Sequence, residues 1–183
     1  LEHWATHVWV QAHQAAVKVA VNAVVTTVKY VSHRVFIDQL GRSVGQANLH
    51  LARLYGHDYT PGKNCIVLTE ERKSNLWVAE LAKQYFDFDA ERYMDLGLNG
   101  ADQFIEMLQG VSADMDIVRE KFHDRTIVLF DDASYSGKQI STHLLQVRTA
   151  VHKYKLSIRE IVVIVPFATP YAQARITEAS MAR

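Results

Sequence analysis

Apolar residues recur along this chain with two different spacings, and the alternation of these spacings predicts alternating helices and strands. After Ser32, a suitable N-cap, apolar residues follow a helical spacing, so we expect a helix with one buried face. A turn at 60–62 precedes the β-prone run 64–69, which we interpret as the first core strand. Helical spacing returns in 75–85. These segments predict one strand-loop-helix unit.

The same order appears again in the second half of the chain. The apolar run 127–130 follows the polar turn 123–125 and predicts a strand, and 140–154 has the apolar spacing of a helix. A strongly apolar strand is expected at 160–166, followed by an exit loop at 167–170. Strand, helix and strand at this spacing predict a right-handed crossover between parallel strands.

The segment between the two units is less regular. Partial alternation at 86–94 favours another strand, and 101–109 has helical spacing, with further helix expected within 110–125. Taken together, the pattern predicts an α/β fold with an open, mainly parallel sheet flanked by helices. With 183 residues, 49% of them apolar, the chain is long enough for one sizeable core. We expect one domain at 32–183, with 1–31 as an extension that covers the core or mediates self-association.

Composition narrows the classes of partner. Twenty Lys and Arg balance twenty Asp and Glu, so net charge gives no electrostatic case for nucleic acid. The Ala- and Val-rich stretch 15–31 is interrupted by polar residues, so no membrane span is expected. A lone cysteine, Cys65, excludes an internal disulfide and suits the cytoplasm, and its apolar strand predicts a buried thiol. His3 and His7 lie at helical spacing, but the chain has no Cys-X-X-Cys or His-Glu-X-X-His pattern, so we predict no metal site built from protein ligands.

The strongest chemical signal is the segment IVLFDDASYSGKQ, residues 127–139. Four apolar residues lead into Asp131 and Asp132, which therefore lie at the carboxyl end of a strand, where open α/β sheets bind ligands. The two carboxylates can accept hydrogen bonds from sugar hydroxyls. Backbone N–H groups of the following turn, with two serine hydroxyls, can surround a phosphate. The loop residues in question are Ala133, Ser134, Tyr135, Ser136, Gly137, Lys138 and Gln139.

This segment resembles the phosphoribosyl pyrophosphate (PRPP) loop of type I phosphoribosyltransferases. That pattern has four apolar residues, two acids, three variable residues, Thr or Ser, Gly, any residue, and Thr or Ser. The chain matches through Gly137, whereas Gln139 replaces the last hydroxyl residue and Tyr135 stands where purine-salvage members have an Asp. The resemblance implies a Rossmann-like fold, PRPP or a nucleoside monophosphate as ligand, and Mg²⁺ carried on the diphosphate oxygens. It also implies a mobile catalytic loop within 95–116.

In the same family, the loop after the first strand receives pyrophosphate. Here that loop contains Arg72 and Lys73, whose cations suit phosphate oxygens, between acidic neighbours and without the usual glycine. The family also places a nucleobase after the strand that follows the PRPP helix, which makes Phe167 a stacking candidate. Residues acting as acid or base are unassigned.

Three interpretations of the sequence therefore remain open. The first is an enzyme that transfers the phosphoribosyl group to an unidentified acceptor and releases pyrophosphate. The second is a catalytically silent module of the same fold that binds a nucleotide or PRPP for regulation. The third is an α/β interaction domain with no small ligand. A homodimer is compatible with each, and neither a nucleic-acid nor a membrane partner is expected.

Overall fold

The structure, a computed structural model, describes residues 31–69, 74–86, 93–95 and 114–181. The chain divides into two compact units, Leu1–Val35 and Phe36–Arg183. In the first unit the described part is 31–35, where Ser32 Oγ accepts a hydrogen bond from the Val35 N–H at 3.3 Å. Ser32 is therefore the N-cap that the sequence predicts.

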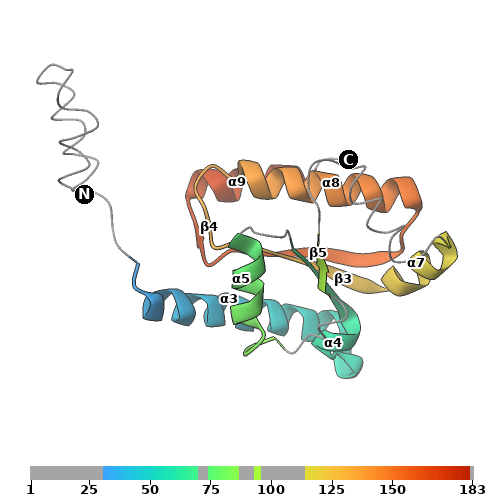
Figure 1. Ribbon diagram of the computed structural model, residues 1–183, viewed down its shortest axis with the longest axis horizontal. Helices are drawn as coiled ribbons and strands as arrows, with labels where there is room; N and C mark the ends of the chain where they lie inside the picture. The colour runs from blue at the N-terminus through green and yellow to red at the C-terminus, as the bar shows by residue number, and fades with distance from the viewer. Residues whose placement is uncertain (1–30, 70–73, 87–92, 96–113, 182–183) are drawn as a thin grey trace, which may run out of the picture. The chain divides into compact units, whose positions relative to one another are not determined.

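A four-stranded sheet with the order β2-β1-β3-β5 forms the centre of the second unit (Figure 1). Its strands are β1 (Cys65–Thr69), β2 (Tyr93–Asp95), β3 (Arg125–Phe130) and β5 (Ile158–Ile164). All three pairs of neighbouring strands are parallel. The predicted α/β architecture, an open and mostly parallel sheet flanked by helices, is confirmed.

Helices cover both faces of this sheet (Figure 1). On one face lie α3 (His33–Tyr55) and α5 (Ser74–Ala82), whose buried side chains pack with those of β1 and β3. On the other face, α7 (Met115–Phe122) and α8 (Lys138–Tyr154) form a second apolar cluster. The helix α9 (Pro170–Met181) lies beside α8. Two short helices, η1 (Gly56–Asp58) and α4 (Pro61–Asn64), lead from α3 into β1.

Burial explains why the central strands appear in the sequence as continuous apolar runs. All five residues of β1 are buried, as are the last five of β3, because helices cover them from both faces. Cys65 is among them, as predicted. On α3, the buried residues repeat at intervals of three or four along one face, namely Leu40, Val44, Ala47 and Leu51.

The predicted boundaries differ from the observed ones at several places. Arg125, assigned to a turn, is the first residue of β3, and β5 begins at Ile158 rather than at residue 160. The two strands have an irregular register here, since Arg125 pairs with Ile158 but Thr126 with Glu160. The bulge interrupts the alternation that sequence reasoning uses to find strand ends. The helix expected at 75–85 also ends early, at Ala82.

Two features were absent from the prediction. A short parallel pair joins β4 (Ala133–Ser134) to β6 (Phe167–Ala168) within the expected exit loop 167–170, and α9 begins at Pro170. Strands of two residues are too short to show a period of two in the sequence. The helix predicted at 101–109 and most of the extension 1–31 lie outside the described residues. No helix in the described ranges combines the length and apolar character needed to cross a membrane.

Candidate functional site

The carboxyl end of β3 carries the two predicted acidic residues, and they occupy different environments. Asp131 is only 4% exposed, whereas Asp132 is partly exposed. The Asp131 N–H donates to the Ile164 carbonyl oxygen at 3.1 Å, which joins this residue to the end of β5. Its Oδ1 accepts hydrogen bonds from Ser74 Oγ and from the Asp132 N–H, each at 3.0 Å. Asp131 is therefore a buried, fixed carboxyl group, and Asp132 is the more accessible of the two.

Burial changes the acidity of Asp131. Desolvation raises the pKa of this carboxyl from 3.8 to about 6, because the protein interior disfavours the charged form. The hydrogen bond from Ser74 opposes the rise, while the carboxylate of Asp132 adds to it. Near pH 6, Asp131 can therefore keep its proton, which avoids placing two negative charges side by side.

Ser74 connects this acidic pair to the first strand-loop-helix unit. It is the first residue of α5 and lies 57 residues before Asp131 in the sequence. The loop with Arg72 and Lys73 falls outside the described residues, but it ends where Ser74 begins. The contact between Ser74 and Asp131 therefore places the first residue of α5 beside the acidic pair. No local pattern in the sequence indicates this contact, because the two residues come from different strand-loop-helix units.

The loop after Asp132 is held through its carbonyl groups. Thr169 donates two hydrogen bonds to it, from its N–H to the Ser134 carbonyl at 3.0 Å and from Oγ1 to the Tyr135 carbonyl at 2.6 Å. Ala133 and Ser134 pair with β6. Thr169, which belongs to the exit segment after β5, thus forms hydrogen bonds with carbonyl oxygens that would otherwise repel an anion. Tyr135 itself is 78% exposed.

The amide groups of the loop have the opposite arrangement. Gly137 adopts a left-handed conformation, φ +68°, and is the N-cap of α8. Ser136 Oγ accepts from the Lys138 N–H at 3.3 Å. Within the described part of the chain, the N–H groups of Ser136 and Gly137 donate no hydrogen bond, and the N–H of Gln139 lies in the unpaired first turn of α8. Because its N–H groups are unpaired and its carbonyl groups are already hydrogen-bonded, this loop is suited to bind an anion.

Glycine is required at position 137 for a second reason. A Cβ atom built on Gly137 would lie 2.9 Å from the Ala172 carbonyl oxygen and 3.1 Å from the Ala172 Cα. The first turn of α9 therefore packs directly against the back of the loop. The loop shape depends on α9 as well as on its own sequence.

A cavity of about 510 Å³ lies next to the loop. Its wall contains loop residue Tyr135, β6 residue Phe167 and Gln173 of α9, together with polar residues of α3. None of the residues that line it carries a charge. The α3 residues are Gln39, Ser43 and Gln46, whose spacing of four and three places them on one face of the helix. This polar stripe beside the apolar one was visible in the sequence but was not interpreted.

Phe167, the predicted stacking residue, also has aromatic neighbours within the protein. Its ring lies 6.1 Å from that of Phe36, which in turn lies 5.1 Å from Trp77. These three rings come from β6, α3 and α5, and Phe36 is the neighbour of both other rings. Phe167 thus contributes to packing and to the cavity wall at the same time.

The described residues contain no group of three or more His, Cys, Asp or Glu side chains arranged to hold a metal ion. The donors present at the loop are the oxygens of Asp131 and Asp132, which are hard ligands of the kind that Mg²⁺ prefers. Because Mg²⁺ on a diphosphate keeps most of its ligands from phosphate and water, this pair is chemically compatible with it.

No protein-family model, curated protein or solved structure matches this chain. Its function is therefore argued from the site itself. The structure brings together Asp131, Asp132, the loop 133–139 and the residue that follows the candidate pyrophosphate loop. It adds Ser74, Thr169 and the neutral cavity, which sequence reasoning missed because each depends on contacts between distant segments.

Proposed function

We propose that this chain is a phosphoribosyltransferase-like protein that binds the ribose-5-phosphate group of PRPP or of a nucleoside monophosphate. The observation that carries the proposal is the hydrogen bond between Ser74 and Asp131. It joins the first residue of α5 to the residue after β3, at the edge where open α/β sheets bind ligands, so that two strand-loop-helix units can contact one ligand. In this proposal the fold is of the Rossmann-like type I class.

Each part of the loop has its own task in this scheme. Asp132, the accessible acid, accepts hydrogen bonds from the ribose hydroxyls, and Asp131 orients it through the Asp132 N–H. The N–H groups of Ser136, Gly137 and Gln139 bind the 5′-phosphate, with the Ser136 hydroxyl beside them. Arg72 and Lys73 are proposed for the diphosphate, and Mg²⁺ bound there would neutralise part of its charge.

Transfer breaks the bond between ribose C1 and the diphosphate oxygen and forms one between C1 and the acceptor. Positive charge develops on the sugar ring, so the protein's contribution is to orient the ring and to stabilise the departing diphosphate. We assign the acceptor to the neutral cavity beside Tyr135, because its amide and hydroxyl groups can bind a polar acceptor without a net charge. Catalytic acid and base residues are unassigned.

A second function has one observation in its favour. Tyr135 is 78% exposed and occupies the position where purine-salvage enzymes have an aspartate, and the cavity wall holds no charged group that exchanges a proton. A protein of this fold that binds PRPP or a nucleotide for regulation, without turnover, is therefore the alternative. It uses the same loop and the same acidic pair.

Binding and turnover can be measured separately. We expect PRPP with Mg²⁺, or a nucleoside monophosphate, to raise the melting temperature, and Asp132→Asn to weaken binding at least tenfold, because one hydrogen-bonding carboxylate contributes about 1.5–3 kcal/mol. Asp58→Asn makes the same change of charge on an exposed residue of η1, near the amino end of β1, and should leave affinity unchanged.

Pyrophosphate release then separates the two functions. Release from PRPP with a panel of acceptors supports the transferase, and tight binding without release supports the regulatory module. If neither PRPP nor any nucleoside monophosphate changes the melting temperature or gives heat in calorimetry, the ribose-phosphate site is refuted.

A further inference from the structure

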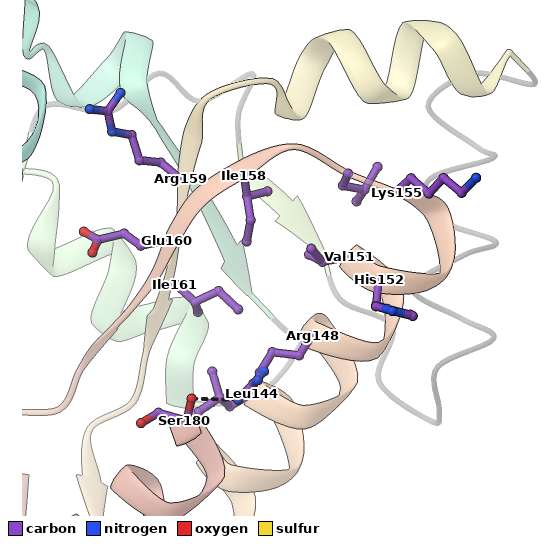
Figure 2. A pocket seen from close by; sticks show the side chains of 11 residues that line it. Leu144, Arg148, Val151, His152, Lys155, Ile158, Arg159, Glu160, Ile161 and Ser180 are labelled. Atoms are coloured by element: carbon purple, nitrogen blue, oxygen red, sulfur yellow. Dashed lines mark hydrogen bonds between the residues drawn. The ribbon is translucent and has the colours of Figure 1, made fainter. Parts of the chain in front are cut away.

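A second and larger cavity, of about 690 Å³, lies between β5 and the C-terminal half of α8 (Figure 2). We call it the β5–α8 groove. Leu144 and Val151 of α8 and Ile158 and Ile161 of β5 project into it from its two sides (Figure 2). It has no part in the site proposed above, because that site lies at the opposite end of α8, around Gly137.

The groove runs along an open strand edge. Within the described residues β5 pairs only with β3, so alternate N–H and C=O groups of its seven residues face outward without a strand partner. Ile161, Val162 and Val163 are only partly buried, although they belong to an apolar core strand. An open edge of this kind is a template for one more strand.

Electrostatics indicates the kind of chain that fits. Three basic residues stand on the α8 side of the groove, Arg148, His152 and Lys155. In the described part of the chain none of them pairs with a carboxylate, and Arg148 instead donates to the Ala179 and Ser180 carbonyl oxygens at 2.9 and 2.7 Å. The acidic residue of the lining, Glu160, points away from α8 (Figure 2). Its Oε1 lies 3.0 Å from His50 Nε2.

We infer that the β5–α8 groove binds an extended acidic segment of a partner protein, which adds to β5 as a further strand. Main-chain hydrogen bonds to the edge supply affinity that is independent of sequence. Alternate side chains of the partner face α8, where carboxylates meet the cations of the rim and apolar groups cover Ile158 and Ile161. This interaction is independent of the ribose-phosphate site.

A second copy of this chain fits the groove less well. Pairing two β5 edges around a twofold axis brings both basic rims together, and like charges that face each other across an interface cost several kcal/mol. An acidic segment instead neutralises the rim on binding. The charge of the groove thus favours a different partner over self-association.

The inference can be tested with short peptides on the whole chain. The probe is a fluorescent, acetylated and amidated peptide of seven residues in which Glu alternates with Val, a length that matches β5. We expect micromolar binding by fluorescence anisotropy, weakened at high salt, and slower hydrogen exchange at 158–164 when the peptide is bound. A peptide with Lys in place of Glu should bind at least tenfold more weakly.

Two controls separate strand addition from simple charge attraction. The Glu-Val peptide with an N-methyl group on every backbone amide keeps its charge but has no N–H to donate to a strand on either edge, so its binding should be lost. The double variant His152→Glu, Lys155→Glu should bind the unmodified peptide at least tenfold more weakly. Lys63→Glu, on an exposed residue of α4, is the matched control and should bind like the wild type.

Several results would overturn the inference. Equal affinities of the Glu and Lys peptides would show that charge does not select the partner. Equal affinities of the N-methylated and unmodified Glu peptides would show that the peptide does not pair with the edge of β5. Absence of any peptide binding to the wild type would show that the groove is not a docking site for an acidic strand. Dimerisation in sedimentation that slows exchange at 158–164 would assign the edge to a second copy instead.

Discussion

Replacing Asp131 with Asn tests whether this carboxyl group is held in the folded protein at a cost in stability. Asn has the same shape, and its amide oxygen can accept the same hydrogen bonds from Ser74 Oγ and from the Asp132 N–H. The substitution therefore removes the charge and keeps the contacts. Above pH 6 the wild-type protein carries a desolvated carboxylate here, and the variant does not.

The size of the effect follows from the raised pKa. A pKa that moves from 3.8 in the unfolded chain to about 6 in the folded protein corresponds to about 3 kcal/mol of destabilisation once the group is ionised. The folded state holds the proton between these two pH values while the unfolded state has released it, so this contribution to stability decreases as pH rises through the window. Between pH 5 and pH 8 the change is roughly 1.4 kcal/mol.

The measurement is the melting temperature of both proteins from pH 5 to pH 8. We expect Asp131→Asn to melt about 3–6 °C further above the wild type at pH 8 than at pH 5. Ser74→Ala should act in the opposite direction, because loss of its hydrogen bond raises the pKa of Asp131 further and lowers stability near neutral pH. Parallel curves for wild type and Asp131→Asn would refute the argument, since they would show that Asp131 titrates alike in both states.

Two further predictions concern packing. Gly137→Ala should destabilise the protein by about 1–3 kcal/mol, because the backbone is left-handed and the new Cβ would lie 2.9 Å from the Ala172 carbonyl oxygen. Gly45→Ala, whose Cβ would have no atom within 4 Å, should be neutral or stabilising by about 0.5–1 kcal/mol. Equal effects of the two substitutions in denaturant unfolding would contradict this prediction. Leu51→Ala should lower the free energy of unfolding by about 2–5 kcal/mol, because the Leu51 side chain is fully buried. Leu49 is 55% exposed, so Leu49→Ala should change the same quantity by less than about 0.5 kcal/mol. Similar values for the two variants would show that the buried face of α3 lies elsewhere.

The regular parts of the fold were predictable because their signals are local. Long apolar repeats located α3 and α8, and continuous apolar runs located β1, β3 and most of β5. Hydrophobic periodicity reports which face of an element is buried, so it is reliable wherever an element is long enough to show one. The pairing of β4 with β6 depends on two-residue segments about thirty residues apart, and no local pattern encodes it.

The site shows the same division. The acidic pair and the glycine turn were found from the sequence because they form one continuous motif. Their surroundings were not, since the burial of Asp131 comes from α5 and β5, and the carbonyl groups of the loop are fixed by Thr169. The spacing of residues along the sequence indicates which side chains meet a ligand. The pKa and the orientation of those side chains depend on tertiary contacts.

The packing of α9 against Gly137 limits how far the motif can be moved to other proteins. A fragment that stopped after β5 would contain every residue of the PRPP-like segment, yet it would lack both Thr169 and Ala172. Grafting 127–139 into another protein would meet the same difficulty, because the new host must replace the hydrogen bonds of Thr169 and the packing of Ala172 against Gly137. The shape of this turn therefore belongs to the whole stretch from β3 to the first turn of α9.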